Sequence, residues 1–341
     1  MHLKPALLAA ALALAGGTAA AESYNLQSAF PKQLPVLGPA IDRFAERVAL
    51  LTDGEVEFRH LGAGELSPPF EIFDNVSVGA IPAGMSFAGY QAGKAPAAAL
   101  FGSMPFGPEP VEYISWLHHG GGLELWREIY APFDVVPMAC GVIISEAGGW
   151  FTRPIETVED LDGLDIRIGG LGGQVYAKLG ANPMSIPAGE ISTSLETGRL
   201  DGTELSFPMV DRLMGFDQVA KHYYFPGWHQ PSGFIEFYMN KDLWDGLSEK
   251  NRAAIETACM EVNLWTIGTA VAAQEEYLEQ FRESGVEVKR LPEPVIEALR
   301  AAAEEVYAEQ AAADEMFARV VESYRDFAAR YDAYRELNAL E

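Results

Sequence analysis

The sequence has little positive charge for its size. It carries 24 Lys and Arg against 49 Asp and Glu among 341 residues, which gives a formal net charge of −25. A charge of that sign argues against nucleic acid or an anionic membrane as the main partner. It does not exclude a small anionic ligand, because one well-placed arginine outweighs a distant average charge.

Cysteine is also scarce, with Cys140 and Cys259 the only two in the chain. Neither belongs to a CxxC motif or to a His/Cys cluster, so the sequence does not indicate a structural zinc site. The two could form a disulfide or remain as buried free thiols, and the sequence leaves both possibilities open.

The common enzyme motifs are missing. There is no G-x-S-x-G and no H-E-x-x-H, and the glycines near position 170 do not complete G-x-G-x-x-G because Val175 breaks the pattern. This lowers the expectation of hydrolase or dehydrogenase chemistry without excluding catalysis.

Long apolar runs are confined to the start of the chain. Lys4 precedes an Ala- and Leu-rich run over 6–15, and Ala19-Ala20-Ala21 fits a cleavage site. The pattern predicts a signal peptide over 1–21 and export to the periplasm. No later segment offers about 18 uncharged apolar residues, the length needed for a membrane helix.

The first part of the remaining chain alternates between two periodicities. Residues 24–30, 55–61 and 83–87 suggest strands, and 36–52 and 68–79 suggest helices. This order predicts an α/β domain with a largely parallel sheet.

The same alternation restarts in the middle of the chain. Strands are expected at 165–169 and 202–206, and helices at 158–164, 174–179 and 191–197. We therefore expect a second α/β domain.

The last third of the chain has helical periodicity. A long helix is predicted over 248–284, and 293–338 contains no Gly and no Pro after Pro294. The latter range carries a heptad-like stripe, which could pack on its own domain or dock on a second subunit. The stripe consists of Phe317, Val320, Tyr324, Phe327, Tyr331, Tyr334 and Asn338.

Four charged residues lie in apolar surroundings. Arg167 needs a partner in its predicted strand, and its planar fork fits either a ligand carboxylate or a protein acid. Glu204 follows a predicted strand, and Glu146 and Glu236 follow apolar runs. The three acids could bind a hard cation such as Ca²⁺ or Na⁺, or could be paired separately.

Several motifs together resemble one family. The stretch 164–204 is similar to the signature region of DctP-type receptors, which serve tripartite ATP-independent periplasmic (TRAP) transporters. Its similarity to the subgroup for 2-oxo and 2-hydroxy monocarboxylates, such as pyruvate or lactate, is greatest. Supporting motifs are Ser28-Ala-Phe-Pro-Lys, Ser67-Pro-Pro-Phe-Glu, Gly148-Gly-Trp-Phe and Tyr223-Tyr-Phe-Pro-Gly-Trp-His.

The resemblance implies an α/β, two-lobed periplasmic binding protein of the type II-like class, with a long connecting helix and a C-terminal dimerisation helix. The implied division has four parts: the signal peptide 1–21; lobe I, 22–145 with 232–250; lobe II with the spanning helix, 146–231 with 251–292; and the dimerisation segment, 293–341.

The resemblance also implies a metal site with Ca²⁺ or Na⁺. Glu204 matches an acidic ligand of the cation, and Glu236 matches a position that is often acidic. Glu146 stands where the family is expected to have Gln. Leu205 stands where a Trp usually offers its backbone carbonyl to the metal.

The implied ligand contacts include Arg167, which matches the arginine that clamps the substrate carboxylate. Tyr90 and Trp228 match aromatic positions near the ligand, and Phe207 stands where a smaller residue is usual. Glu146 and Glu204 would also face the substrate.

The function implied is a receptor without enzymatic activity. It binds a small organic acid with a metal ion, hands it to the TRAP membrane permease subunits, and forms a homodimer; no nucleic acid takes part. Two alternatives stay open from the sequence: an exported metal-dependent enzyme acting on carboxylic acids, and a receptor that delivers its ligand to a sensor.

Overall fold

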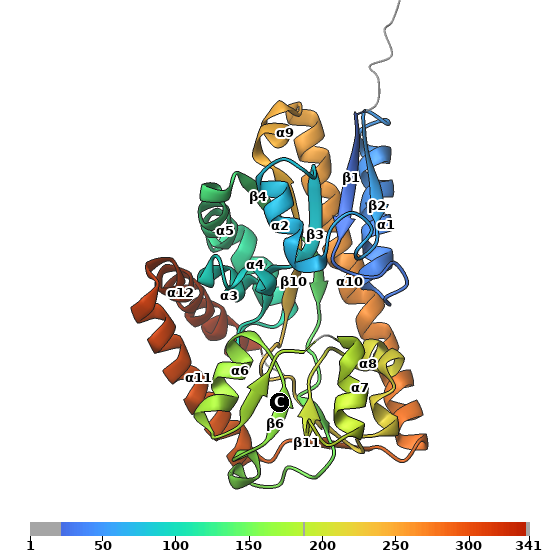
Figure 1. Cartoon of the computed structure of the whole chain (residues 1–341). Coiled ribbons are helices and arrows are strands. Elements are labelled where there is room, and N and C mark those ends of the chain that lie inside the picture. The colour runs from blue at the N-terminus through green and yellow to red at the C-terminus, as the bar shows by residue number, and fades with distance from the viewer. Residues whose placement is uncertain (1–21, 187, 339–341) are drawn as a thin grey trace, which may run out of the picture.

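The structure is a computed structural model, and it describes residues 22–186 and 188–338. Figure 1 shows two α/β lobes, one above the other, joined by strands and by a long helix. This arrangement confirms the expected α/β fold with two lobes. The predicted signal peptide, 1–21, lies outside the described residues. Within the described part of the chain, no helix has the length and apolar composition needed to cross a bilayer.

Lobe I contains a five-stranded sheet in the order β2-β1-β3-β10-β4. The strands β1, β2 and β3 are parallel, and β10 is antiparallel to both of its neighbours. Every residue of β10 is buried, because helices cover both faces of the sheet at this point. The strands are β1 (Glu22–Ser28), β2 (Val56–Leu61), β3 (Ala83–Phe87), β4 (Val135–Ile143) and β10 (Gly233–Asn240).

Helices pack on both faces of this sheet, and each face has its own apolar core. On one face, α1 (Leu37–Leu51) buries Phe44 and Val48 against the strands. The other face is covered by a second apolar cluster with several shorter helices. The shorter helices of lobe I are α2 (Ile72–Ser77), α3 (Ala99–Gly102), α4 (Pro110–His119), α5 (Gly122–Tyr130) and α9 (Lys241–Gly246).

Lobe II is built on a six-stranded mixed sheet in the order β11-β9-β5-β8-β6-β7. Its strands are β5 (Gly149–Phe151), β6 (Asp165–Arg167), β7 (Asn182–Met184), β8 (Gly202–Thr203), β9 (His222–Phe225) and β11 (Glu287–Arg290). Its helices are α6 (Gly170–Lys178), α7 (Ala188–Glu196) and α8 (Pro208–Met214).

The chain crosses between the two sheets through two short segments. The first crossing segment, 144–148, leads from β4 to β5, and the second, 226–232, leads from β9 back to β10. Both crossing segments pass through the middle of the molecule (Figure 1). Side chains placed there lie at the junction of the lobes.

The long helix α10 (Glu249–Glu283) runs past both lobes. It begins where Ser248 Oγ accepts a hydrogen bond of 3.1 Å from the Asn251 N–H, as its sequence predicts. Its first part contacts α1 and β4 of lobe I, and its later part contacts α8 and β11 of lobe II. The predicted division, which gave 251–292 to lobe II, differs from these contacts for the first part of the helix.

A disulfide joins α10 to β4. Cys140 in β4 and Cys259 in α10 are bonded across 119 residues of sequence, which settles the alternative that the sequence left open. Two hydrogen bonds continue this attachment along the helix. Asn263 Oδ1 accepts from the Gly141 N–H at 2.6 Å, and Thr266 Oγ1 accepts from the Val142 N–H at 2.8 Å.

The C-terminal region is two helices rather than one. α11 (Glu293–Ala313) packs on α6 of lobe II, and α12 (Glu315–Asn338) packs on α4 and α5 of lobe I. The chain turns at Asp314, whose Oδ1 accepts a hydrogen bond from the Phe317 N–H and so favours a new helix start.

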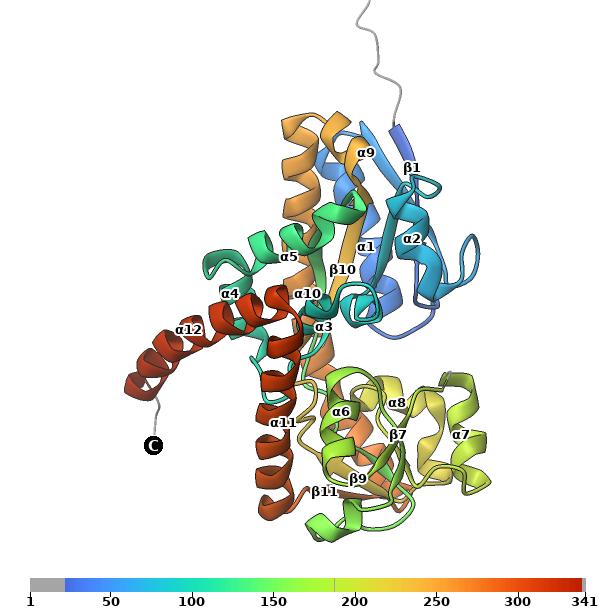
Figure 2. The same cartoon turned by 60° about the vertical axis from the view of Figure 1, so that its left-hand side comes forward.

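The apolar stripe of this region has two different environments. Phe317 and Val320 are buried within their own chain. Tyr334 is 66% exposed and lies near the end of α12, which projects away from the body of the molecule (Figure 2). The first turns of α12 therefore pack within the chain, and docking of the stripe on a second subunit stays a prediction.

We predict that the disulfide contributes strongly to stability. Because it closes a loop of 119 residues, replacing Cys140 and Cys259 together by Ala should lower the free energy of unfolding by about 4 kcal/mol. Urea unfolding followed by circular dichroism measures this loss, and the unaltered protein under reducing conditions is the matched comparison. An unchanged urea midpoint in both would mean that the two thiols are unpaired in solution.

Candidate functional site

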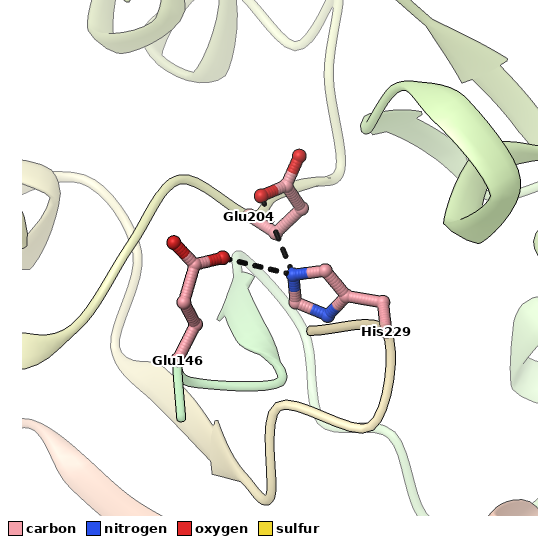
Figure 3. Close-up of side chains that lie close together, drawn as sticks. All are labelled: Glu146, Glu204 and His229. Atoms are coloured by element: carbon pink, nitrogen blue, oxygen red, sulfur yellow. Dashed lines mark hydrogen bonds and ion pairs between the residues drawn. The ribbon is translucent and has the colours of Figure 1, made fainter. Parts of the chain in front are cut away.

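Three segments distant in sequence meet at the junction of the lobes. Glu146 belongs to the first crossing segment, His229 belongs to the second, and Glu204 directly follows β8. Figure 3 shows the three side chains pointing toward one another. All three are buried, and one ligating atom from each lies within 4.8 Å of the others. Among residues 22–186 and 188–338, no other group of acids, histidines or cysteines comes together in this way.

The imidazole stands between the two carboxylates. His229 Nε2 lies 3.2 Å from Glu146 Oε2 and 3.5 Å from Glu204 Oε2. The other ring nitrogen, Nδ1, is buried without a hydrogen-bond partner in the described part of the chain. The ring therefore makes its polar contacts only toward the two acids.

Main-chain hydrogen bonds hold the three segments together. The Glu146 N–H donates to the Gln230 carbonyl at 3.2 Å, and the Ala147 N–H donates to the Ser206 carbonyl at 3.1 Å. Gly227 allows the closest approach, because a Cβ at this position would stand 2.2 Å from the Glu146 carbonyl oxygen. These backbone contacts therefore determine where the three segments meet.

Arg167 joins the group from the end of β6. It pairs in register with Thr203 of β8, which brings it beside Glu204. Its Nη1 donates to the carbonyl oxygen and to Oε1 of Glu204, both at 2.8 Å, while its Nε has no partner among the described residues. The structure agrees with both alternatives for Arg167, a protein acid or a ligand carboxylate as its partner. Its protein partner, Glu204, is itself a candidate ligand residue, and part of the guanidinium donor set remains free.

Tyr90 approaches from lobe I. It lies on a 3-10 turn, Ala88–Gln91, directly after β3. The residue as a whole is 41% exposed, and its ring packs edge-on against Phe70 and Phe87. Burial raises the pKa of the Tyr90 phenol; Arg167 opposes this rise, and Glu204 and Glu146 add to it. The phenol therefore lies within electrostatic reach of the charges on lobe II.

Trp228 is placed beside the same group. Its indole is buried, stacks on Phe106 at a centroid distance of 5.6 Å and meets Tyr176 edge-on at 5.2 Å. The Trp228 Nε1 and the Tyr176 hydroxyl are buried without hydrogen-bond partners in the described chain.

The buried surroundings and the mutual contacts of Glu146, Glu204 and His229 shift the pKa values of all three. Burial raises the pKa of Glu146 to about 7, although the hydrogen bond with His229 opposes that rise. Burial lowers the pKa of His229, but its hydrogen bonds with Glu146 and Glu204 outweigh this and raise the pKa to about 9. Burial also opposes ionisation of Glu204, yet the charges of Arg167 and His229 together hold its pKa below the usual range.

Glu236 lies apart from this group, contrary to the expectation of a shared metal site. It sits in the middle of β10, and its carboxylate accepts hydrogen bonds from Ser86 Oγ at 2.8 Å and from the Tyr130 hydroxyl at 2.7 Å. Burial raises its pKa to about 7. Because both carboxylate oxygens face lobe I partners, the geometry gives Glu236 a place in the core rather than beside Glu146 and Glu204.

Leu205 and Phe207 occupy packing positions. The Leu205 side chain is half-buried and contacts apolar clusters of both lobes. Phe207 is fully buried at the start of α8 and packs in the cluster formed by α1 and α10. The predicted ligand roles of these two residues stay predictions.

His229 is the site residue that sequence reasoning undervalued. The sequence places it just before a strand, in Tyr223-Tyr-Phe-Pro-Gly-Trp-His, but offers no ligand spacing to Glu146 or Glu204. Its neighbours come from positions 83 and 25 residues away, and only the crossing of the two segments brings them together.

The comparisons with known proteins identify one family. The profile of DctP, described as "Bacterial extracellular solute-binding protein, family 7", matches residues 28–314. The chain belongs to this family. The resemblance read from the sequence motifs is thereby confirmed, and this DctP-family protein is a solute-binding receptor of the TRAP transporter class.

Several relatives of this DctP-family receptor have known ligands or structures. A monocarboxylate 2-oxoacid-binding periplasmic protein of Nostoc sp. is 34% identical over 275 residues, which cover 81% of this chain and 75% of the relative. A TRAP solute-binding protein of Bordetella bronchiseptica, with calcium and picolinate, is 31% identical with a TM-score of 0.89, covering 93% of this chain and 95% of its own. One of Colwellia psychrerythraea, with calcium and pyruvate, is 30% identical with a TM-score of 0.89, covering 94% and 98%.

A buried acid behind the site provides a test of its electrostatics. Asp211 of α8 accepts hydrogen bonds at Oδ2 from Trp150 Nε1 at 2.9 Å and from the Tyr223 hydroxyl at 2.8 Å. Its Oδ1 is buried without a partner in the described chain. Burial raises its pKa to about 8, and the charges of Glu146 and Glu204 add to the rise.

We predict that Asp211 makes folding less favourable as the pH rises. In the folded chain the Asp211 carboxyl keeps its proton up to about pH 8. In the unfolded chain it loses that proton near the usual pKa of an aspartate, about 4. Between these values, the stability of Asp211→Asn relative to the unaltered protein should therefore increase with pH, by up to about 1.4 kcal/mol per pH unit. Urea unfolding of both proteins at several pH values measures this difference. A difference that does not change with pH would mean that Asp211 is ionised in the folded state.

Proposed function

We propose that this receptor binds a small 2-oxo or 2-hydroxy monocarboxylate, of the size of pyruvate or lactate, together with a cation. The observation that carries the proposal is the position of Arg167 beside the group of Glu146, Glu204 and His229 at the junction of the lobes. A guanidinium for the ligand carboxylate and a set of donors for a cation lie side by side.

Arg167 has the donors that a carboxylate requires. Its Nη1 is engaged by Glu204, whereas its Nε is free of protein partners in the described chain. The side chain is 21% exposed, so a ligand in the cleft can reach it. A carboxylate can accept two parallel hydrogen bonds from the free edge of such a fork.

The donor set also fits the cation that the family implies. Glu146 and Glu204 supply carboxylate oxygens, the ligands that Ca²⁺ and Na⁺ prefer. A 2-oxo or 2-hydroxy oxygen next to the ligand carboxylate could complete a chelate on such a cation. In the related structures, calcium accompanies pyruvate in the Colwellia protein, and sodium accompanies pyruvate in a Pseudoalteromonas atlantica protein.

The aromatic residues would shape the rest of the pocket. Tyr90 would close over the ligand from lobe I, and Trp228 would border it from the second crossing segment. Closure of the lobes would remove water from Arg167 and the acids and so strengthen their contacts with an anionic ligand. Phe207 would act on pocket shape only through its packing.

The receptor would work in the periplasm and hand its ligand to the TRAP membrane permease subunits without covalent change. The family consists of solute-binding receptors, which supports this over the alternative of a metal-dependent enzyme. A sensor as the recipient stays the second alternative. Steady consumption of pyruvate or lactate by the pure protein would overturn the assignment as a receptor.

We predict that Arg167→Ala weakens pyruvate binding by about a hundredfold or more, because it removes the charged partner of a desolvated carboxylate. Isothermal titration calorimetry in the presence of Ca²⁺ measures the affinity. Thermal unfolding without ligand is measured alongside, because leaving buried Glu204 without its ion-pair partner should by itself lower the melting temperature.

The matched control is Arg212→Ala. Arg212 is another half-buried arginine of lobe II, and it pairs with Asp217 at 3.2 Å. This variant should keep the affinity for pyruvate. If Arg167→Ala binds pyruvate normally and only melts earlier, Arg167 is a structural ion-pair residue and the proposed ligand clamp is wrong.

The homodimer is a further part of the proposal, with α12 as its contact. Leu337 is 87% exposed and Tyr334 is 66% exposed on the projecting end of this helix. Two large apolar side chains at 3-residue spacing on an uncovered helix end favour contact with another surface. The related Bordetella protein is described as a dimer.

We predict that Tyr334→Glu combined with Leu337→Glu weakens the dimer by about thirtyfold or more, since charges replace apolar contacts. Light scattering coupled to size-exclusion chromatography, over a range of protein concentrations, measures the effect. Leu50→Glu is the control, because Leu50 of α1 is also exposed, at 65%, but lies far from α12 in sequence and fold. A dimer that resists the double substitution, or an unaltered protein that is monomeric throughout, would contradict this role of α12.

A further inference from the structure

We infer that Phe106, in the loop between α3 and α4 of lobe I, is a positioning residue that holds Trp228 in its orientation beside the ligand. The inference deepens the proposed function and rests on it, because Trp228 is taken there to border the ligand from the second crossing segment. Two observations carry it: the backbone of Phe106 is strained, and both its backbone and its ring contact Trp228.

The backbone conformation of Phe106 is unfavourable for its residue type. The loop makes a turn in which the Gly107 N–H donates a hydrogen bond of 2.8 Å to the Met104 carbonyl, so that Pro105 and Phe106 are the two central residues. Phe106 has a φ of 55°, a value that glycine or asparagine adopts more easily at this position of a turn. Within the part of the chain that the structure describes, it is the one aromatic residue with a positive φ. A bulky side chain in this conformation persists only where other contacts hold it.

The contacts that hold Phe106 are made with the second crossing segment. The Phe106 N–H donates a hydrogen bond of 2.7 Å to the Trp228 carbonyl. The two rings stack with centroids 5.6 Å apart and planes inclined by 27°. At the start of the same loop, Ser103 Oγ donates a hydrogen bond of 2.7 Å to the His229 carbonyl. The φ angle of Phe106 sets the direction of its ring relative to its N–H, so the strained turn is what allows both contacts with Trp228 at once.

The indole of Trp228 is also enclosed from lobe II. Tyr176 of α6 meets it edge-on at a centroid distance of 5.2 Å, and only 2% of Trp228 is exposed. The indole in turn meets the ring of His229 edge-on at 5.7 Å. A change in the tilt of the indole would therefore also disturb the imidazole that contacts Glu146 and Glu204.

Helix α11 holds the loop from its other side. The Tyr307 hydroxyl of this helix donates a hydrogen bond of 2.9 Å to the Pro105 carbonyl, next to the strained residue. The guanidinium carbon of Arg300, on the same helix, lies 4.2 Å from the centre of the Phe106 ring, within cation–π distance. Since α11 packs on α6 of lobe II (Figure 2), the position of Phe106 is fixed from both lobes.

The first test separates the role of the ring in binding from its role in stability. Phe106→Gly removes the ring and relieves the backbone strain. Isothermal titration calorimetry with pyruvate and Ca²⁺ should show a loss of affinity of about tenfold, the size expected when a stacked aromatic pair is lost. The melting temperature without ligand should fall less than in a variant that loses an unstrained ring of the same kind, because relief of strain offsets part of the lost packing.

Phe133→Gly is the matched control for this comparison. Phe133 is a half-buried phenylalanine that packs against the same apolar cluster as Phe106. Its ring lies edge-on to Phe73 at a centroid distance of 5.3 Å, in lobe I. The control should keep the affinity for pyruvate and should lose more in melting temperature than Phe106→Gly.

Two further variants show whether the effect passes through Trp228. Phe106→Tyr keeps the stacked ring and should bind pyruvate like the unaltered protein. Trp228→Ala should weaken pyruvate binding by itself. In the Trp228→Ala background, Phe106→Gly should cause no further loss, because two residues that act through one contact are not additive.

A measurement without ligand tests the positioning directly. The chain has 6 Trp residues, and isotope-labelled tryptophan gives each indole N–H its own signal in the NMR spectrum. The signal that is missing in Trp228→Ala belongs to Trp228. Phe106→Gly should shift or split this signal, because the indole loses the ring current and the support of the stacked phenyl ring. Phe133→Gly and Phe106→Tyr should leave it in place.

Three results would overturn the inference. They are an unchanged Trp228 signal in Phe106→Gly, an unchanged pyruvate affinity in that variant, and additive losses of affinity in the Trp228→Ala background, which would mark Phe106 as a purely structural residue. An unaltered protein that binds no pyruvate would contradict the proposed function instead. The tryptophan spectra would then still decide whether Phe106 holds Trp228, since they require no ligand.

Discussion

The arrangement of the molecule depends on neutralising buried carboxylates at the junction of its lobes. Glu204 is held between the guanidinium of Arg167 and the imidazole of His229, and Glu146 shares that imidazole. Removing such charges from water costs several kcal/mol per ion unless partners compensate. The partners come from β6 and from the second crossing segment, whereas Glu146 belongs to the first, so the charge balance requires the two crossing segments to lie side by side. The residues that form the site therefore also hold together the two segments that connect the lobes.

The elements with clear periodicity were predictable from sequence. The strand at 83–87 coincides with β3, and the long helix predicted over 248–284 is α10 with its Ser248 cap. Residues 110–130 form α4 and α5, which the sequence reading did not identify. The two helices are short, with 10 and 9 residues, and Gly120-Gly121-Gly122 interrupts the helical pattern between them. The turn at Asp314 was missed because the range 293–338 has no Gly, and no Pro after Pro294, to mark a helix end.

Site residues were predictable from sequence only where the residue is unusual in its local sequence. Arg167 and Glu204 stood out as charges at strand ends, and the parallel pairing of β6 with β8 brings them together. Glu236 was selected because it follows an apolar run, but it lies elsewhere, because its carboxylate faces Tyr130 of α5 and Ser86 of β3. His229 had no such signal in the sequence, since its partners depend on how the two crossing segments pack. Sequence patterns indicate which charges need partners, but tertiary packing decides which partners they meet.

The attachment of α10 to β4 has a mechanical consequence. Cys259, Asn263 and Thr266 fix the first part of the helix to a strand of lobe I. Farther along, Gln274 Oε1 accepts a hydrogen bond from the Met209 N–H of lobe II. Only the turns between Thr266 and Gln274, about 12 Å of helix at 1.5 Å per residue, are free of these attachments, and Gly268 lies among them. The helix is therefore attached to lobe I on one side of this span and to lobe II on the other. Movement of one lobe relative to the other is limited to the bending that this short span of helix allows.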